Sequence, residues 1–518
     1  MDTWIDELLP LPRPEYVKQT ESLLTDLIWR SKGSSLSKAP GAETQTYFDL
    51  LSELVTRKDG KPQPPYLDRL IPLRAYQGHP GVVETEPIAH EVDFGSVLTA
   101  PAGLPAPTRA LLTSIRAPRS RGDRSLACVP VHPDAVILQT LHGLVNKDSP
   151  PNIAKAIEMM GLLGGSDGDG AVAAAYLRAV TSQATAKQGL TGLMNAIFPA
   201  LAAGVWSELP KKSSDPTKTL PSWPAVASRN PPVQKTSFAD SYKLTPFRWF
   251  FRHWSTLCEP ANNWADALPT RRYVDWAMCL LRTGLAFSYL WEAEFFVRLH
   301  SYLVERAEGP DSTDKGNAFR SMFADGAVLA TFEPASTPAT QKEAWSALNS
   351  LLARGYQARQ RFQAHLKDGP PTPAVTAGLL STAESWVNTL PKTKLDSLAL
   401  PLRVDARTPK TQREFIRYLL QPRSSDDDSA DQADFYYLAR RNSRRIFWFQ
   451  PGPEWLVVVT SLLAVRPGGR CTLGMLIGDL ATLGIKVERW VLVSLLEEAG
   501  LSIDSPDADN ALVIRAGF

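Results

Sequence analysis

The stretch "TRRYVDWAMCLLRTGLAFSYLWEAEFFVRLHSYLVER", from Thr270 to Arg306, carries the clearest structural signal in the chain. It contains no proline, and its apolar residues recur every three or four positions, which is the spacing of a helix. It lies in the most aromatic part of the sequence, residues 246–306. The pattern predicts one long helix or two short ones, packed deeply inside the protein.

Length and composition set the broad class. The chain has 518 residues, of which 44% are hydrophobic and 21% charged, as in folded globular proteins. This length predicts about two to four domains. The net charge of +2 excludes a strongly basic binder of polyanions but leaves room for local basic patches. Helical patterns along most of the sequence predict a mainly α, multi-domain protein.

Changes in composition divide the chain into five regions. The stretch 208–237 contains six prolines, and proline blocks helix and removes backbone donors, so a boundary is placed there. Before it, residues 61–130 are less regular and are expected to hold one or two short strands. The predicted regions are a mostly helical N-terminal domain (1–207), a Pro/Ser-rich linker or long loop (208–245), a central aromatic-rich helical domain (246–400), a basic and aromatic connector (401–450) and a small C-terminal module (451–518).

Cysteine usage and the N-terminus indicate the compartment. The cysteines form no C-x-x-C pair and are far apart in sequence: Cys128, Cys258, Cys279 and Cys471. We therefore expect no zinc site, no disulfide framework and no cofactor, and a cytoplasmic location. The N-terminus lacks the apolar core of a signal peptide. No membrane span is expected from the sequence.

The C-terminal module follows a specific order of elements. "PEWLVVVTSLLA" predicts an apolar helix, and "RPGGRCT" a turn that leads into a short strand. "TLGMLIGDLATLG" predicts a helix with Thr472 as its cap and Gly484 past its end. "VERWVLVSLLEEAGL" predicts a third helix, and the last residues read as strand, polar turn and strand. In this order, the last 65 or so residues resemble a winged helix-turn-helix.

The resemblance implies a DNA-reading third helix, but the charge of the module favours another use. The positions implied for DNA contact are Lys486, Arg489 and Ser494 on the third helix and Arg515 in the wing. From Glu454 to Phe518 there are five basic and eight acidic residues, and the wing sequence "DSPDADN" is acidic. An acidic wing repels the phosphates that supply much of the affinity for DNA. Docking of a protein partner is therefore the leading use of this module, and DNA reading is the alternative.

The connector carries two groups of arginines. "TPKTQREFIRYLLQPR" predicts a helix capped by Thr408, with Lys410, Arg413 and Arg417 on one face. "FYYLARRNSRRIFWF" then places Arg440, Arg441, Arg444 and Arg445 among aromatic residues. Arginines beside aromatics are typical of surfaces that grip single strands or phosphates.

A structural interpretation of this second group stays open. The arginines can pair with the acidic residues of Asp426–Asp434, and the aromatic residues can belong to the core. A further basic cluster, predicted to be an exposed loop, consists of Arg116, Arg119, Arg121 and Arg124.

No catalytic motif stands out. The chain has no P-loop and no H-E-x-x-H. "GGSDGDG" (164–170) resembles the start of a calcium loop, but Arg178 stands where the bidentate glutamate is needed, so a turn is preferred. Glu292 and His300 lie eight residues apart on the predicted long helix, and an enzyme site there is one alternative. The spacing of Arg271, Arg272 and Asp275 indicates a structural ion pair.

These observations lead to a functional hypothesis. The leading interpretation is a non-enzymatic subunit or adaptor of a larger bacterial assembly that acts on nucleic acid, in antiviral defence or genome maintenance. Other protein subunits are the expected partners, with DNA or RNA bound through a local basic and aromatic patch. The alternatives are a stand-alone DNA-binding regulator and an enzyme with a site near Glu292 and His300.

Overall fold

The computed structural model describes residues 9, 11–12, 14, 23–28, 152–168, 170–186, 242–309, 314–332, 338–366, 378–403, 410–422, 434–441, 447–501 and 512–517. Of these residues, 72% are helical, which confirms the mainly α class. The predicted strands of 61–130, the arginine cluster of 116–124 and the proline-rich stretch 208–237 lie outside the described residues. The division of the chain into five regions stays a prediction.

One central helix organises the fold. α12 runs unbroken from Thr270 to Glu308, so the first of the two predicted alternatives is confirmed. Its 39 residues span about 58 Å at 1.5 Å per residue. Every residue from Trp276 to Ala293 is buried, on all sides of the helix. The helix ends at Gly309, whose φ of 127° is a conformation that side chains disfavour.

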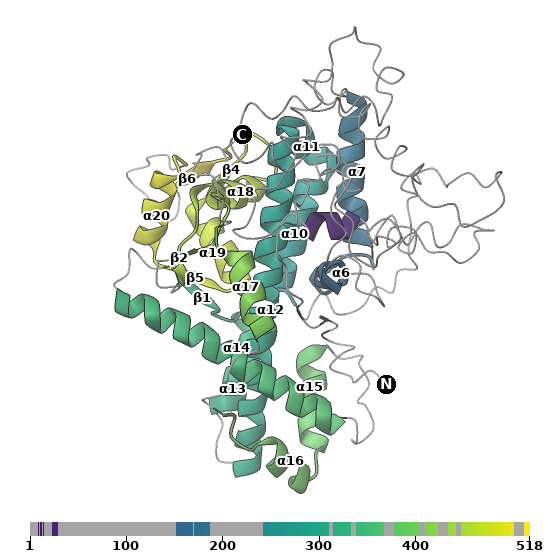
Figure 1. Cartoon of the computed structure of the whole chain (residues 1–518), viewed down its shortest axis with the longest axis vertical. Helices are drawn as coiled ribbons and strands as arrows, with labels where there is room; N and C mark the ends of the chain where they lie inside the picture. Colours follow the sequence, from purple (N-terminus) through teal and green to yellow (C-terminus); the bar gives the residue numbers. More distant parts are fainter. Residues whose placement is uncertain are drawn as a thin grey trace, which may run out of the picture.

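Shorter helices surround α12 along its length (Figure 1). α6 (Asn152–Gly164), α7 (Ala171–Ala186), α10 (Pro246–Cys258), η5 (Pro260–Asn262) and α11 (Trp264–Ala267) lie around its first half. α13 (Asp314–Ala324), α14 (Pro338–Leu366), α15 (Leu379–Thr389) and α16 (Lys392–Leu398) lie around its second half. α17 (Lys410–Leu420) packs against α12 and α14.

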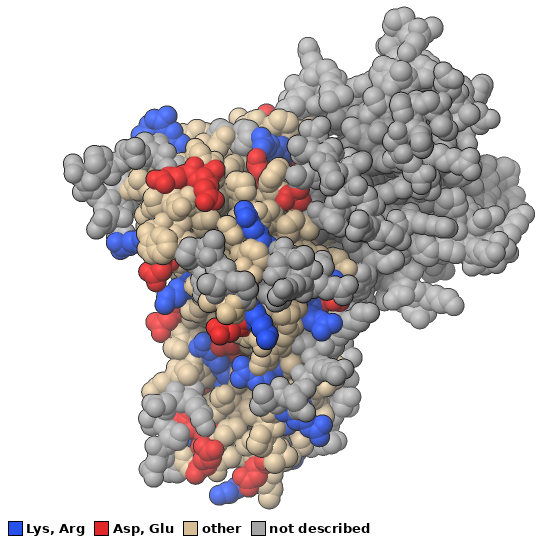
Figure 2. All heavy atoms as spheres, turned by 60° about the vertical axis from the view of Figure 1, so that its left-hand side comes forward, with Lys and Arg blue, Asp and Glu red and all other residues tan. Residues whose placement is uncertain are grey.

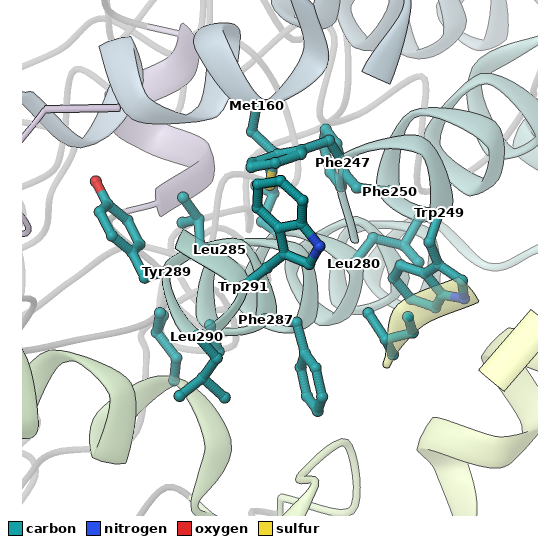
Figure 3. Close-up of a cluster of buried hydrophobic side chains, with 14 of the residues drawn as sticks. Met160, Phe247, Trp249, Phe250, Leu280, Leu285, Phe287, Tyr289, Leu290 and Trp291 are labelled. Atoms are coloured by element: carbon teal, nitrogen blue, oxygen red, sulfur yellow. The ribbon is translucent and has the colours of Figure 1, made fainter. Parts of the chain in front are cut away.

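Aromatic side chains fill the space between α12 and its neighbours. Trp291 of α12 meets Phe247 of α10 edge to face, with ring centroids 5.4 Å apart (Figure 3). α10 starts where Thr245 accepts a hydrogen bond from the Arg248 N–H and Pro246 holds the first helical position. This start aims Phe247 and Phe250 at α12, where both are fully buried.

The crossing of α12 and α14 depends on two small residues. A Cβ atom added at Gly355 of α14 lies 2.6 Å from the Cα of Ala293 on α12, closer than atoms can approach. Only glycine at this position lets the two backbones meet. α14 is thereby fixed across the middle of the central helix (Figure 1).

The C-terminal residues form three helices and three short strands. In chain order these are α18 (Pro453–Leu463), β4 (Arg470–Thr472), α19 (Leu473–Leu483), β5 (Ile485–Val487), α20 (Arg489–Glu498) and β6 (Val513–Arg515). The Thr472 hydroxyl accepts from the Met475 N–H, and Gly484 ends α19 with a φ of 95°, which confirms the predicted cap and stop. β4 pairs with β6 in antiparallel register. Most residues expected to form the first strand of the predicted hairpin lie outside the described part of the chain.

Two further strand pairs were not expected from the sequence. β2 (Ala439–Arg441) and β3 (Phe447–Phe449) form an antiparallel hairpin inside the predicted connector. β1 (Ala330–Phe332), which follows α13, pairs in parallel with β5 of the C-terminal module. Trp455 of α18 adds a second link, because its indole N–H donates to the Thr283 hydroxyl of α12 at 2.9 Å. Buried hydrophobic residues from Leu9 to Ile514 accordingly form one continuous cluster.

Candidate nucleic-acid interface

The β2–β3 hairpin presents arginine and aromatic side chains together. Arg440 of β2 is exposed and stands opposite Trp448 of β3, which is half-buried. The Nε of Arg440 donates to the Tyr437 hydroxyl at 3.1 Å, and its guanidinium carbon lies 5.9 Å from the Tyr437 ring centre. The Trp448 indole N–H donates to Oε1 of Gln450 at 3.2 Å. These contacts hold the exposed Arg440 over the Tyr437 ring, across the hairpin from Trp448.

The inner face of the hairpin is held against the core. Ala439 and Phe449 are cross-strand partners and are both buried. The Phe449 ring lies 6.1 Å from that of Phe287 on α12. Gly452 follows the hairpin and touches Phe435 so closely that a Cβ atom there lies 2.1 Å from the Phe435 carbonyl oxygen. The outward residues thus stand on a well-packed base rather than on a free loop.

A buried ion pair anchors the segment that enters the hairpin. Arg282 of α12 and Asp434 are both buried, with 2.9 Å between Nη1 and Oδ2. Arg282 also donates to the carbonyl oxygens of Leu419 and Gln421, at the end of α17. Asp434 is therefore held by Arg282, and pairing of the acidic run with the arginines of the hairpin stays a prediction. The other acidic residues of that run lie outside the described residues.

β1 connects the hairpin to the C-terminal module. It contacts β3 and pairs with β5, which lies beside it in Figure 1. Thr331 stands opposite Lys486, and both are exposed. Arg489, in the first turn of α20, is exposed, and Trp490 beside it is 62% exposed. The tertiary structure therefore joins β2, β3, β1 and β5, so the hairpin and the start of α20 belong to one side of the molecule.

The charge on this side is mixed. Figure 2 shows basic and acidic side chains interspersed over the described surface that it views, without one continuous basic area. Glu488, Glu497 and Glu498 of the C-terminal module are exposed, in the same segment as Lys486 and Arg489. This arrangement suits a partner protein with mixed charge better than an extended polyanion along α20.

The remaining predicted contact residues fall in different settings. Arg413 and Arg417 share one helix face, as predicted, but both approach the Glu414 carboxylate, and Arg417 also lies over the Tyr418 ring. Their charge is therefore partly neutralised. Lys410 begins α17 and Arg441 ends β2. Thr408, Arg444 and Arg445 lie outside the described residues.

A buried polar centre links α10 to α19. The Asp479 carboxylate accepts hydrogen bonds from the Trp249 indole N–H at 2.8 Å and from the His253 Nε2 at 2.9 Å, and it also pairs with Arg252. Burial, with a smaller contribution from Arg252, lowers the pKa of His253 well below its ordinary value of 6.5. His253 and Asp479 are each 1% exposed at the side chain, so no substrate reaches them. In the sequence, this centre is indicated by Asp479, the one charged residue of the apolar stretch "LGMLIGDLATL".

Glu292 and His300 do not face a common site. Glu292 pairs with Arg359 at 2.7 Å, beside a small pocket of about 20 Å³, which holds little more than a water molecule. His300 Nε2 lies 3.0 Å from the Leu400 carbonyl oxygen. Arg271 pairs with Asp275 at 3.2 Å, which confirms the predicted structural ion pair. Arg272 instead pairs with Glu454 of α18.

Glu158 and two of the cysteines have structural roles. The Glu158 carboxylate of α6 accepts from the backbone N–H groups of Gly170, Val172 and Ala173, so it caps α7 after the "GGSDGDG" turn. Burial raises the pKa of the Cys258 thiol to about 12 and that of Cys471 to about 11, which leaves both unreactive. Across the described ranges, no group of three or more His, Cys, Asp or Glu residues is arranged to hold a metal ion. No helix in those ranges is long and apolar enough to cross a membrane.

Comparisons of the chain with protein-family models, with curated proteins and with solved structures gave no significant match.

Proposed function

We propose that this chain is a non-enzymatic subunit or adaptor of a larger bacterial assembly that acts on nucleic acid. In this proposal the β2–β3 hairpin contacts the nucleic acid, and the winged-helix-like C-terminal module docks a partner protein. The observation that carries the proposal is the exposed Arg440, oriented by Tyr437 and paired across the hairpin with Trp448. Arginine and aromatic faces presented together bind phosphates and stack on bases.

The docking role rests on α20. Its inner residues Val491, Leu492 and Leu495 are buried, whereas Trp490 is 62% exposed. An exposed tryptophan amid charges of both signs is typical of protein interfaces, where tryptophan is enriched at the centre. Purification of the full chain from its native cells tests this role. A co-purifying ATPase or nuclease supports the subunit, whereas a homodimer alone on a palindromic site supports the regulator.

The nucleic-acid role is tested by charge reversal in the full chain. The variant carries Arg440→Glu, Arg441→Glu, Arg444→Glu and Arg445→Glu, and binding is followed by fluorescence anisotropy with labelled single-stranded and duplex oligonucleotides at several salt concentrations. Each lost arginine–phosphate contact reduces the slope of log affinity against log salt by about 0.9 for a duplex and about 0.7 for a single strand. The expected result is at least about tenfold weaker binding at low salt, with a slope reduced by up to about 3.6 or about 2.8, respectively.

A matched control separates the hairpin from net charge. The control makes the same charge change at exposed residues on other elements: Lys155→Glu, Arg178→Glu, Lys392→Glu and Arg403→Glu. It should retain the affinity and salt slope of the parent. Equal binding by the parent and a hairpin variant with an unchanged melting temperature would remove the hairpin from the interface.

A further inference from the structure

Two arginines of the C-terminal module stand directly opposite each other. The register of β4 and β6 pairs Arg470 with Arg515. Both are exposed, whereas Cys471 and Ile514 beside them point into the core. The backbone bonds Ala516 N–H to Gly469 O and Leu473 N–H to Leu512 O place the two arginines in a non-hydrogen-bonded pair. In such pairs the Cα atoms are only about 4.5 Å apart, the closest approach that antiparallel strands allow.

This pairing is unfavourable unless an anion joins it. Like charges directly opposite each other on a sheet destabilise it. Within the described part of the chain, no ion pair and no side-chain hydrogen bond involves Arg470 or Arg515, so no carboxylate there offsets the repulsion. The module as a whole is acidic, which makes two adjacent arginines without a carboxylate partner among its described residues a local exception to its charge.

The turn before β4 brings a third arginine to the same end of the strands. Arg466 is exposed, and its carbonyl oxygen accepts from the Gly469 N–H at 3.0 Å, which closes a tight turn one residue before Arg470. Val465 enters this turn with a φ of 69°, a conformation that is rare for β-branched residues. The Trp264 indole N–H holds it there by donating to the Val465 carbonyl oxygen at 2.7 Å. Strained backbone that is held by its surroundings is a feature of ligand sites.

We propose that Arg470 and Arg515, with Arg466, form a binding site for a phosphate group. A guanidinium binds an oxyanion with two parallel hydrogen bonds. A phosphate has several oxygens and up to two negative charges, so it can bind both neighbouring guanidinium groups at once. A carboxylate has two oxygens and one charge, so it can bind only one guanidinium group in this way. Free phosphate and a phosphate of a nucleic-acid backbone share this chemistry. The site is separate from the β2–β3 hairpin and does not depend on the function proposed for it.

The test uses the full chain with Arg470→Gln and Arg515→Gln. Melting temperatures are measured at low ionic strength in chloride and in inorganic phosphate of matched ionic strength, and binding of a short oligonucleotide and of polyglutamate is measured by anisotropy. We expect phosphate to raise the melting temperature of the parent, and the double variant to lose that rise. In chloride the variant should melt at or above the parent, because the repulsion between the arginines is removed. A purely structural role for the pair predicts a lower melting temperature.

Each outcome decides for or against the site. If inorganic phosphate raises the melting temperature of the parent but not of the double variant, the site is supported and free phosphate is a sufficient ligand. Loss of oligonucleotide binding alone supports it with the nucleic-acid backbone as the source. Polyglutamate that binds as tightly as the oligonucleotide, and is also lost in the variant, overturns the preference for phosphate. Identical responses of parent and variant overturn the site, as does the same loss in the charge-matched control Lys155→Gln with Arg178→Gln.

The hairpin proposal and the phosphate-site proposal can be refuted independently of each other. The fourfold hairpin variant should keep the melting response to inorganic phosphate, because all three arginines of this site are intact. Unchanged nucleic-acid binding by the hairpin variant, with a lost phosphate response in the double variant, contradicts the hairpin and supports the phosphate site.

Discussion

Asp479→Ala is expected to be strongly destabilising, because it removes the acceptor shared by α10 and α19. Two donors of that acceptor, the Trp249 indole N–H and the His253 Nε2, belong to buried residues and have no route to water. An unpaired buried donor costs about 1–3 kcal/mol, so the two together cost about 2–6 kcal/mol. Arg252 has a 45% exposed side chain and can turn to solvent, so its lost pairing adds little.

Urea unfolding of the full chain, followed by tryptophan fluorescence, measures this effect. Arg252→Ala serves as the control and should destabilise the chain less than Asp479→Ala, because the Asp479 carboxylate keeps its hydrogen bonds from Trp249 and His253. Asp479→Asn keeps one acceptor oxygen and should fall between the two. If Asp479→Ala is no worse than Arg252→Ala, the centre does not hold α19 against α10, and the reasoning is refuted.

Three further predictions concern packing, pH and the enzyme alternative. Gly355→Val should destabilise the chain by about 1–3 kcal/mol, because the added side chain overpacks against α12. The control Gly478→Ala, in open space within α19, should stabilise it by up to about 1 kcal/mol. Equal melting temperatures of the two variants would contradict the close crossing of α12 and α14. Below pH 6.5 the unfolded chain takes up a proton at His253 that the folded chain does not, because burial lowers the folded pKa. As the pH falls below 6.5, the parent should therefore lose about 1.4 kcal/mol of unfolding free energy per pH unit relative to His253→Gln. Parallel profiles of unfolding free energy against pH for the two proteins would contradict this prediction. Glu292→Gln with His300→Ala should leave nucleic-acid binding within about twofold, about 0.4 kcal/mol, whereas lost binding at an unchanged melting temperature would point back to a site on α12.

Local features of this chain could be predicted because their causes lie within a few residues. The absence of proline and the apolar spacing from Thr270 to Arg306 produce α12, since a helix needs only contacts between residues three and four apart. Thr472 and Gly484 delimit α19 for the same reason, because caps act on the adjacent turn. The arginines and aromatics of "LARRNSRRIFWF" likewise marked a candidate interface from composition alone.

Pairings between distant residues were decided by the tertiary structure. β1 and β5 are three residues each, and nothing in either sequence specifies the other, which lies about 150 positions along the chain. Asp434 pairs with Arg282, 152 positions before it in the sequence, because the end of α17 packs on α12. From the sequence, Arg515 was named only as a wing residue, and the register of β4 and β6 is what places Arg470 directly opposite it. Electrostatic and strand contacts act over a few ångströms of space, and only the packing of the whole chain determines which residues come that close.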